Sequence, residues 1–503
     1  MDLIANLALG FSTAVSLQNL GLCFIGVLLG TLIGVLPGIG PVATISMLLP
    51  ITHGIEPTGA LIMLAGIYYG AQYGGSTTSI LVNLPGVASS VVTCIDGYQM
   101  ARQGRAGPAL AIAAIGSFFA GTVATLLCAM MAAPLASVAS KFGPAEYFSL
   151  MVLGLIGAVL LANKSVLRAV GMVVFGLILG IVGTDSNTGT LRFDFGLHDL
   201  YDGIGFVGVA VGVFAIAEIV GNLENNENRE IFTERVDGLM PTREDLKASA
   251  MPIVRGTFLG SALGVLPAGG ALIASFASYA LEKRIAKDPS RFGKGAIEGV
   301  AGPESANNAG AQTSFIPMLT LGIPPNVVMA LMIGAMMLHN IQPGPDVMFK
   351  QPALFWGLIV SMWIGNLMLL VLNLPLVGLW VKLLSIPYRL LYPAIILFCC
   401  IGVYTLGNNT FDVYVAVVFG FVGYILSRIG CEPAPMLLGF VLGPLMEEYF
   451  RRALLIERGD FSVFISRPIS AALLAITLAL VISLALPAIS QARNKAVSEA
   501  EKG

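Results

Sequence analysis

The chain has 503 residues, of which 56% are hydrophobic and 11% are charged, and its mean hydropathy is +0.85. This composition excludes a soluble globular protein with an ordinary surface and predicts an all-α, polytopic protein embedded in the lipid bilayer. The 27 basic and 29 acidic residues give a net charge of −2, which argues against a nucleic-acid partner because no strongly basic domain exists.

Long uncharged stretches predict membrane-spanning segments. The stretches 3–55, 57–95, 106–140, 352–381 and 468–492 contain no Asp, Glu, Lys or Arg, and each exceeds the roughly 20 residues that cross a hydrocarbon core. We expect about 10–12 transmembrane helices in total. In chain order the expected spans are 18–50, 59–86, 109–136, 146–162, 166–183, 203–221, 251–281, 296–338, 352–380, 388–406, 411–428, 433–449 and 467–490.

A polar interval divides the chain into two halves. The predicted organisation is an N-terminal membrane repeat at 1–221, a polar linker at 222–250, a C-terminal membrane repeat at 251–490 and a polar tail at 491–503.

Two motifs recur in the halves. Residues 34–40 read GVLPGIG and residues 264–270 read GVLPAGG, an offset of 264 − 34 = 230. The sequence GAQ at 70–72 returns at 310–312, an offset of 310 − 70 = 240. Irregular backbone of this kind is tolerated at membrane depth only where it lines a cavity or a site. We therefore predict two repeats with broken or re-entrant segments.

The basic residues predict how the repeats are oriented. In the first half, the loop after GVLP (52–58) has no Lys or Arg, whereas the loop after GAQ carries Arg102 and Arg105. In the second half the pattern is reversed, because the basic cluster lies at 282–294 and the loop after GAQ has only Lys350. Since basic loops are cytoplasmic, equivalent loops face opposite sides, which predicts inverted repeats. We expect loop 282–294 to be cytoplasmic together with Arg102 and Arg105.

Small polar residues follow both breaks. Their hydroxyls and amides can bind a carboxylate, and freed backbone carbonyls can coordinate Na⁺. The alternative is close helix packing, with Ser and Thr bonded to their own helix; for the whole cluster we favour a binding site. The side chains expected to contact substrate or cation are Ser76, Thr77, Thr78, Asn83, Asn307, Asn308, Gln312, Thr313 and Ser314. Substitutions at Ser117 and Ser361, outside the repeated motifs, are expected to matter much less.

Glycines are expected to serve this site differently, by letting the backbone approach the ligand where a Cβ would intrude. They are Gly38, Gly40, Gly74, Gly75, Gly269 and Gly270.

Glu304 is the one acid between Glu298 and Asp346. An intramembrane carboxylate indicates a cation ligand or a proton carrier; the alternatives are a residue near a helix N-cap after Pro303 or an interfacial acid. The other acids are expected in interface ion pairs (Glu218, and Glu447 with Glu448 beside Arg451 and Arg452) or in a loop turn (Asp96).

No Lys or Arg lies near either polar patch. Helix N-termini, hydroxyls and a co-transported cation would therefore hold a bound anion. Cation coupling is favoured because a multiply charged anion entering alone opposes the membrane potential by about 2.3 kcal/mol per charge per 100 mV. We expect Na⁺ or H⁺ as the coupling ion, no other cofactor and no other metal.

Two other classes of function compete with transport. A membrane-embedded enzyme acting on lipid or peptide needs a nucleophile with a base or a metal cluster, and the three scattered histidines and unclustered acids supply neither. A passive channel is not favoured by the duplicated broken segments. We therefore expect a transporter and not an enzyme.

At these motifs the sequence resembles the large membrane subunit of tripartite tricarboxylate transporters (TctA-like), over roughly residues 15 to 485. The motifs that carry the resemblance are GVLPGIGP (34–41), YYGAQYGGSTTSILVNLPG (68–86), DGYQMARQGRAGPAL (96–110), GTDSNTG (183–189), GPESANNAGAQ (302–312), LTLGIPP (319–325) and PGP (343–345). The chain departs from the family pattern at Ala268, where Pro-Gly-x-Gly is usual, and at Pro325, where glycine is usual.

The resemblance implies a multi-pass permease of the bacterial inner membrane that takes up carboxylates by symport, driven by an ion gradient. It implies two partners, a small four-helix membrane subunit and a periplasmic solute-binding protein. We also allow for assembly into a homo-oligomer. The resemblance does not determine which carboxylate is carried.

Overall fold

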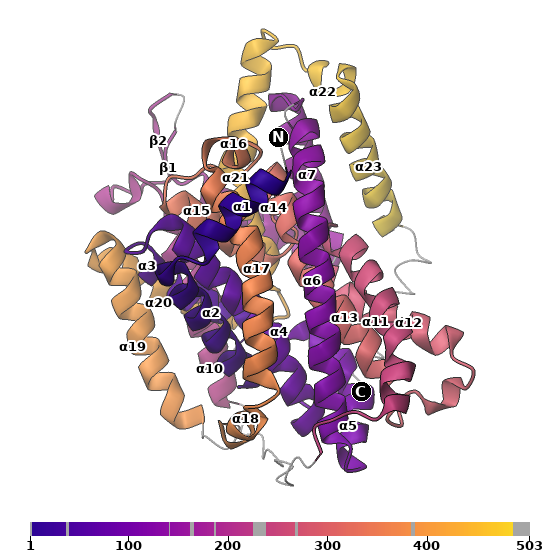
Figure 1. The fold of residues 1–503 in the computed structure, drawn as a ribbon. Helices are drawn as coiled ribbons and strands as arrows, with labels where there is room; N and C mark the ends of the chain where they lie inside the picture. Colours follow the sequence, from indigo (N-terminus) through magenta and orange to yellow (C-terminus); the bar gives the residue numbers. More distant parts are fainter. Residues whose placement is uncertain are drawn as a thin grey trace. The chain divides into compact units, whose positions relative to one another are not determined.

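The computed structural model describes residues 3–36, 40–139, 141–160, 165–185, 188–224, 238–266, 270–383 and 388–485. This part of the chain is helical almost throughout (Figure 1), and its one sheet pairs β1 (Gly183–Thr184) antiparallel with β2 (Leu191–Arg192). The helices are α1 (Leu3–Ala14), α2 (Leu17–Val35), α3 (Pro41–Thr52), α4 (Pro57–Val82), the 3₁₀ turn η1 (Ala88–Ser90), α5 (Val91–Arg102), α6 (Ala106–Ala139), α7 (Pro144–Leu160), α8 (Val166–Gly180), the 3₁₀ turn η2 (His198–Leu200), α9 (Phe206–Ala210), the π-helical segment η3 (Val211–Ile216), α10 (Ala217–Glu224), α11 (Arg243–Gly264), α12 (Gly270–Ile285), the 3₁₀ turn η4 (Pro289–Arg291), α13 (Glu298–Thr313), α14 (Phe315–Leu321), α15 (Val327–Leu338), α16 (Asp346–Lys350), α17 (Pro352–Asn373), α18 (Val377–Leu383), α19 (Tyr388–Gly407), α20 (Thr410–Arg428), α21 (Pro433–Ile456), α22 (Val463–Ser466) and α23 (Pro468–Ala485).

Among the described residues, five helical spans are long and apolar enough to cross a membrane: Leu17–Val35, Ala106–Ala139, Phe206–Leu223, Pro352–Asn373 and Thr410–Arg428. Seven shorter apolar helices accompany them, among them α3 and α15 with 12 residues each. The expected all-α membrane fold is confirmed.

The chain forms two compact units, and each takes one segment from each half of the sequence. The first unit comprises Met1–Ala136 and Glu218–Gly402, and the second comprises Ser137–Ala217 and Val403–Gly503. The compact units therefore cut across the two sequence halves. Within the polar interval 222–250, residues 225–237 lie outside the described residues, as does the tail 491–503.

Regularly spaced glycines let two pairs of helices in the first unit pack closely. In Figure 1, α2 lies beside α4, and α11 lies beside α13. Glycines recur every fourth residue along α2 and α11, and a Cβ on any of them would meet backbone atoms of the neighbouring helix at less than van der Waals distance. The two sets are offset by 256 − 26 = 230, so the repeat predicted from the GVLP motifs recurs in the packing. These seam glycines are Gly26, Gly30 and Gly34 in α2, and Gly256, Gly260 and Gly264 in α11.

The helix breaks follow from local chemistry. Helix α4 ends at Asn83 in a left-handed conformation (φ 57°), and α14 ends at Gly322 in the same conformation (φ 72°), as is common at helix C-termini. Prolines follow both ends and cannot continue the ladder of backbone hydrogen bonds. The side chain of Asn326 then accepts a hydrogen bond from the Met329 nitrogen and starts α15.

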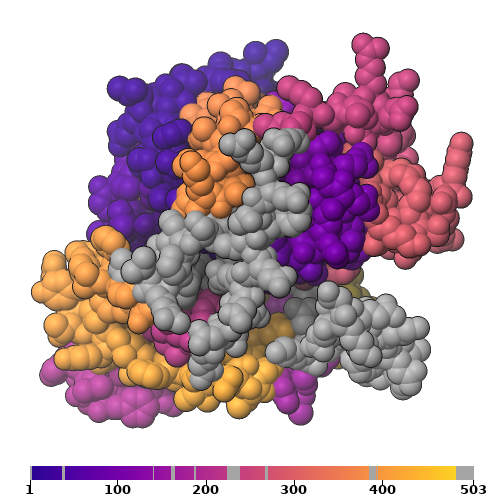
Figure 2. All heavy atoms as spheres, turned by 90° about the horizontal axis from the view of Figure 1, so that it is seen from below, coloured from indigo at the N-terminus to yellow at the C-terminus, as the bar shows by residue number. Residues whose placement is uncertain are grey.

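A core cluster joins the N-terminal helices to α18. Figure 2 shows α18 in orange between the indigo N-terminal helices and the violet chain near residue 100. There Val377 and Trp380 pack in one cluster with Val35, Ile80 and Met100.

In the second unit, α21 packs against α7 and α8, and α20 packs against α9 and η3. The sheet is fixed to α21 by ion pairs: Arg192 lies 2.9 Å from Glu447, and Arg451 lies 3.0 Å from Asp185. Glu448 pairs with Arg452 at 3.1 Å. The expectation that Glu447 and Glu448 are ion-paired is confirmed.

Three elements differ from the sequence-based expectation. Helix α1 was not expected, and it packs against α17. Asp96 was expected in a loop turn but is fully buried within α5, so that expectation is wrong. Helix α11 begins eight residues before the expected span (251 − 243 = 8), because Thr242 and Asp245 form a capping box at its start.

Candidate functional site

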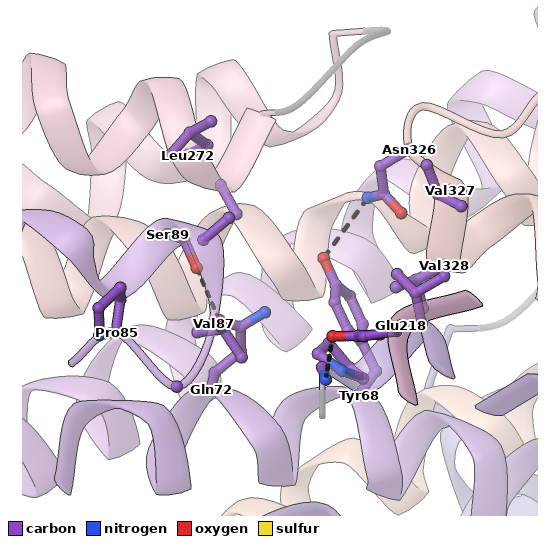
Figure 3. Close-up of a pocket in the computed structure, with 16 residues that line it drawn as sticks. Tyr68, Gln72, Pro85, Val87, Ser89, Glu218, Leu272, Asn326, Val327 and Val328 are labelled. Atoms are coloured by element: carbon purple, nitrogen blue, oxygen red, sulfur yellow. Dashed lines mark hydrogen bonds between the residues drawn. The ribbon is translucent and has the colours of Figure 1, made fainter. Parts of the chain in front are cut away.

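A cavity of about 480 Å³ lies within the first unit, where the two sets of broken segments meet. Both halves line it: the first with residues of α3, α4 and 85–89, the second with residues of α12 and α15, and α10 adds one acid. Figure 3 shows the polar lining residues Tyr68, Gln72, Ser89, Glu218 and Asn326 around this space.

Three helices begin at the cavity wall. Gly40, Pro41 and Val42 are the N-cap and first residues of α3, Ala271 and Leu272 belong to the first turn of α12, and Asn326 is the N-cap of α15. Unpaired amide donors and the positive end of the helix dipole lie at such termini. The cavity wall is therefore suited to an anion although it has no Lys, Arg or His among the described lining residues.

Hydrogen bonds fix the polar side chains of the cavity. Asn326 Nδ2 donates to the Tyr68 hydroxyl at 3.4 Å, and Ser89 Oγ donates to Gln72 Oε1 at 2.9 Å. The Gly40 nitrogen donates to Glu218 Oε1 at 3.4 Å (Figure 3).

A buried carboxylate lies on α13, next to α4. Glu304 is 0% exposed and accepts hydrogen bonds from Ser76 Oγ at 2.5 Å and from the Thr93 hydroxyl. Ser76 Oγ also lies 3.0 Å from the carbonyl oxygen of Gln72, a residue of the cavity wall. A chain of polar contacts therefore leads from the cavity to Glu304.

Amide side chains extend this buried polar group along α13. Asn308 and Gln312 follow Glu304 at intervals of four residues, so the three lie on one face of the helix. Asn308 Nδ2 donates to Ser117 Oγ at 2.7 Å, while its Oδ1 atom and both amide atoms of Gln312 have no hydrogen-bond partner within the described residues. Asn307 is equally buried. Buried amide atoms of this kind are able to hydrogen-bond water or to coordinate an ion.

Other predicted side chains bond to backbone within the helix packing. Thr78 Oγ1 donates to the Val35 carbonyl at 2.9 Å, at the end of α2. Thr313 and Ser314 donate to carbonyl oxygens of their own helix region at 3.0 and 2.7 Å. Thr77 is buried, and Asn83 is the exposed C-cap of α4. Ser117 was expected to lie apart from the site, but its contact with Asn308 joins it to the buried polar group.

The predicted glycines have different surroundings. Gly40 lines the cavity, and a Cβ there would meet no atom of the described residues within 4 Å. A Cβ on Gly75 would meet Val87 at 2.8 Å, one on Gly270 would meet Leu263 backbone at 2.6 Å, and one on Gly74 would overlap α2 backbone. These three serve close packing in this structure. Gly38 and Gly269 lie outside the described residues.

Several residues of the cavity wall were not predicted from the sequence: Tyr68, Gln72, Ser89, Glu218 and Asn326. Glu218 was expected in an interface ion pair, but it lines the cavity and contacts the Gly40 amide. The sequence contained a signal for this position, because a lone acid within the apolar span Phe206–Leu223 indicates a functional residue.

A family model for the tripartite tricarboxylate transporter TctA family matches residues 20–438. The chain belongs to the TctA family. The suspected relationship is thereby confirmed, and it makes this protein a transporter subunit of a tripartite system rather than a member of an enzyme family.

Two curated relatives from Agrobacterium vitis are similar to this TctA-family chain. One, described as an uncharacterized 52.8 kDa protein in the TAR-I ttuC' 3' region, is 63% identical over 499 residues, which is 99% of each chain. The other, an uncharacterized protein in the TAR-II ttuC' 3' region, is 63% identical over 240 residues, which is 48% of this chain and 99% of the relative. No solved structure matches the chain.

Proposed function

We propose that this chain is the substrate-translocating permease of an ion-coupled symporter for tricarboxylates or related carboxylates in the bacterial inner membrane. The observation that carries the proposal is the cavity bordered by the N-termini of α3, α12 and α15. A volume of about 480 Å³ suits a small metabolite, since ligand pockets occupy roughly 300 to 1,000 Å³.

The chemistry of the cavity wall favours a carboxylate. Three helix N-termini, the Gln72 amide and the Ser89 hydroxyl offer hydrogen bonds and partial positive charge. Without a lysine or arginine among the described lining residues, the charge of a multiply ionised substrate is left partly uncompensated. A co-transported cation supplies that compensation.

Glu304 is the proposed site of the coupling ion. Ser76 Oγ lies within hydrogen-bond distance of both the Gln72 carbonyl and Glu304 Oε2, yet a hydroxyl has a single proton to donate. Both contacts are satisfied when Glu304 is protonated and donates to Ser76. A Na⁺ ion bound here would have to move these two oxygen atoms apart, because they lie 2.5 Å from each other. The amide oxygen of Asn308, one helical turn from Glu304, is of the kind that binds Na⁺.

Alternating access requires two repeats that open to opposite sides, and the packing of the short helices supports this arrangement. Helix α3 packs against α15, whereas α12 packs against η1 and α5, so each pair combines the two halves. At 12 residues, α3 and α15 extend about 18 Å, too short to cross the bilayer. We infer inverted repeats with re-entrant segments and about 10–12 membrane-embedded helices.

The proposed partners are a small four-helix membrane subunit and a periplasmic binding protein that selects the solute. Family membership supports a tripartite system. The cavity has few groups that would distinguish one carboxylate from another, which fits selection by a separate binding protein.

Uptake by proteoliposomes tests the proposal. The chain is reconstituted with its two partner subunits, and accumulation of radiolabelled citrate and succinate is followed with and without inward Na⁺ and H⁺ gradients. We expect saturable uptake that requires a gradient. The substitution Gln72→Leu at the cavity wall should reduce it at least about tenfold, the effect of losing roughly 1.4 kcal/mol.

The matched control is Gln18→Leu, because Gln18 is exposed and is not one of the residues that line the cavity. It should transport like the wild type. Flux that neither saturates nor depends on a gradient would favour a passive channel and overturn the proposal.

A further inference from the structure

Glu218 occupies a position suited to a substrate carboxylate. It is the only charged side chain among the described residues that line the cavity, and its Oε1 atom receives the Gly40 amide at the start of α3. The N-cap residue of α3 is Gly40, which has no side chain with which to cap the helix. Since helix N-termini attract carboxylates, Glu218 supplies from another helix the anion that this terminus favours.

A charged Glu218 opposes the binding of an anion. Two carboxylates in one cavity repel each other, and the repulsion is strong where water is excluded. Among the described residues of the surrounding elements α3, α4, α12, α15 and 85–89, the only other titratable lining group is Tyr68, whose hydroxyl is bonded to Asn326. No basic side chain of the described lining offsets the negative charge of Glu218.

Protonation removes this conflict without occupying space. We infer that Glu218 takes up a proton from water when the anionic substrate binds, so that this residue couples proton uptake to substrate binding. The proton leaves a hydronium ion or a buffer acid of the solvent and bonds to a carboxylate oxygen of Glu218, so one bond to hydrogen breaks and one forms. The neutral carboxyl group can then donate a hydrogen bond to the substrate, while the N-terminus of α3 is freed for the substrate carboxylate. This inference rests on the proposed function.

The helix that carries Glu218 has an irregular backbone. The π-helical segment Val211–Ile216 ends two residues before Glu218 within the apolar span Phe206–Leu223. Such segments weaken the regular hydrogen-bond ladder and occur frequently at functional sites. The backbone before Glu218 is therefore suited to a shift of the carboxyl group when its charge changes.

Calorimetric binding measurements test this inference. The full chain with its membrane partner subunit is titrated with citrate at pH 6 and pH 8, in two buffers of different ionisation enthalpy, which gives the number of protons taken up per citrate bound. The variants are Glu218→Gln and Glu218→Asp, with Glu244→Gln as the control at an exposed position on α11. Citrate changes its own protonation equally in all of them, so the differences between proteins report on Glu218.

We expect the wild type to take up about one proton more per citrate than Glu218→Gln. At pH 8, Glu218→Gln should bind citrate at least about tenfold more tightly than the wild type, because its side chain no longer carries a charge. Glu218→Asp should restore proton uptake, and Glu244→Gln should behave as the wild type.

Equal proton uptake by the wild type and Glu218→Gln, with citrate bound by both, overturns the inference but leaves the proposed function standing. If citrate binds to none of these proteins at either pH, the proposed function fails, and this inference fails with it.

Discussion

Two carboxylates in the first unit are completely buried, and their hydrogen-bond partners differ in kind. Asp96 accepts hydrogen bonds from the nitrogen atoms of Gly293, Gly295 and Ala296 at 2.8–2.9 Å and from the Tyr279 hydroxyl. Backbone amides can only donate, so the Asp96 carboxylate serves as a fixed acceptor for this loop, which indicates a structural role. Glu304 faces two hydroxyl groups, which both donate and accept, so its surroundings suit either protonation state.

The first residue-scale prediction concerns Asp96. Replacing it with alanine removes the acceptor of three backbone amides and should lower the free energy of unfolding by about 1–3 kcal/mol. Thermal unfolding in detergent, followed by intrinsic fluorescence, measures the effect. Asp288→Ala in the neighbouring loop is the control, because Asp288 is exposed and bonds only to Ser290 among the described residues. An unchanged melting temperature for Asp96→Ala would show that water replaces the carboxylate at little cost.

The second concerns Glu304. Glutamine keeps the shape, and it can accept a hydrogen bond from one of the two hydroxyls and donate one to the other, but it neither releases a proton nor attracts a cation. We expect Glu304→Gln to fold and to lose uptake at least about tenfold, the scale of one charge-assisted interaction. Glu298→Gln, on the same helix and paired with Arg291, is the matched control and should transport normally. Normal uptake by both variants would leave Glu304 with a structural role.

At the residue scale, the sequence predicted chemistry better than position. Glu304 and the predicted polar residues Ser76 and Asn308 lie in hydrogen-bond contact, and Gln312 is buried on the same helix face, while their role in binding substrate or an ion stays a prediction. The cavity wall itself was largely missed. Its polar groups are single residues such as Gln72 and Asn326, which come together only through tertiary packing, and no spacing along the chain encodes that.

At the level of elements, the closest helix contacts depend on glycine, because van der Waals packing drives association in a bilayer. The seam glycine Gly30 faces the Ile67 backbone, whereas a Cβ added to Gly21 on the same helix would meet no neighbouring atoms within 4 Å. The helices α2 and α4 therefore tolerate a side chain at Gly21 and not at Gly30.

This contrast gives the third prediction. Gly30→Val should push α2 away from α4 and reduce stability by about 1–3 kcal/mol or more, whereas Gly21→Val should leave it nearly unchanged. Gly260→Val in α11 should reproduce the Gly30→Val effect, since Gly260 faces the Ala306 backbone in the same way. Melting temperatures and monodispersity in detergent compare the three variants. If Gly30→Val and Gly21→Val behaved alike, the close packing of α2 on α4 through Gly30 would not be needed for stability.

Hydropathy predicted most helices because each has to bury or shield its backbone in the membrane. Hydropathy alone predicted a single span for α2 with α3, and another for α11 with α12, because the residues between these helices are apolar. Glycine and proline in the repeated motifs predicted those breaks. Helices α1 and α5 were missed, because α1 shares an uncharged run with α2 and α5 contains Asp96, whose acceptor role depends on a loop two hundred residues away.

At the scale of the whole molecule, the ends of the short helices test the orientation of the repeats. His53 and His339, at the ends of α3 and α15, stack with ring centroids 6.4 Å apart. Gln103, which follows α5, donates to the Lys294 carbonyl at 2.8 Å, near the end of the loop that connects α12 to α13. The basic segments predicted to share the cytoplasmic side therefore lie together, which composition alone could not establish.

The last prediction assigns these two groups of loops to opposite faces of the membrane. In a variant with its native cysteines replaced, single cysteines are introduced at Gly54 and Gln342 for one group, and at Arg102 and Asp288 for the other. An impermeant maleimide added to intact cells should label Gly54→Cys and Gln342→Cys, while the Arg102→Cys and Asp288→Cys variants should react only after the membrane is opened. The reason is that Lys and Arg near membrane spans are retained on the cytoplasmic side.

Because α3 and α12 both begin at the cavity, their far ends reach opposite sides only if the repeats are inverted. Labelling of Gly54→Cys and Asp288→Cys from the same side would instead require parallel repeats, and a cavity bordered by both would then need a different route for alternating access.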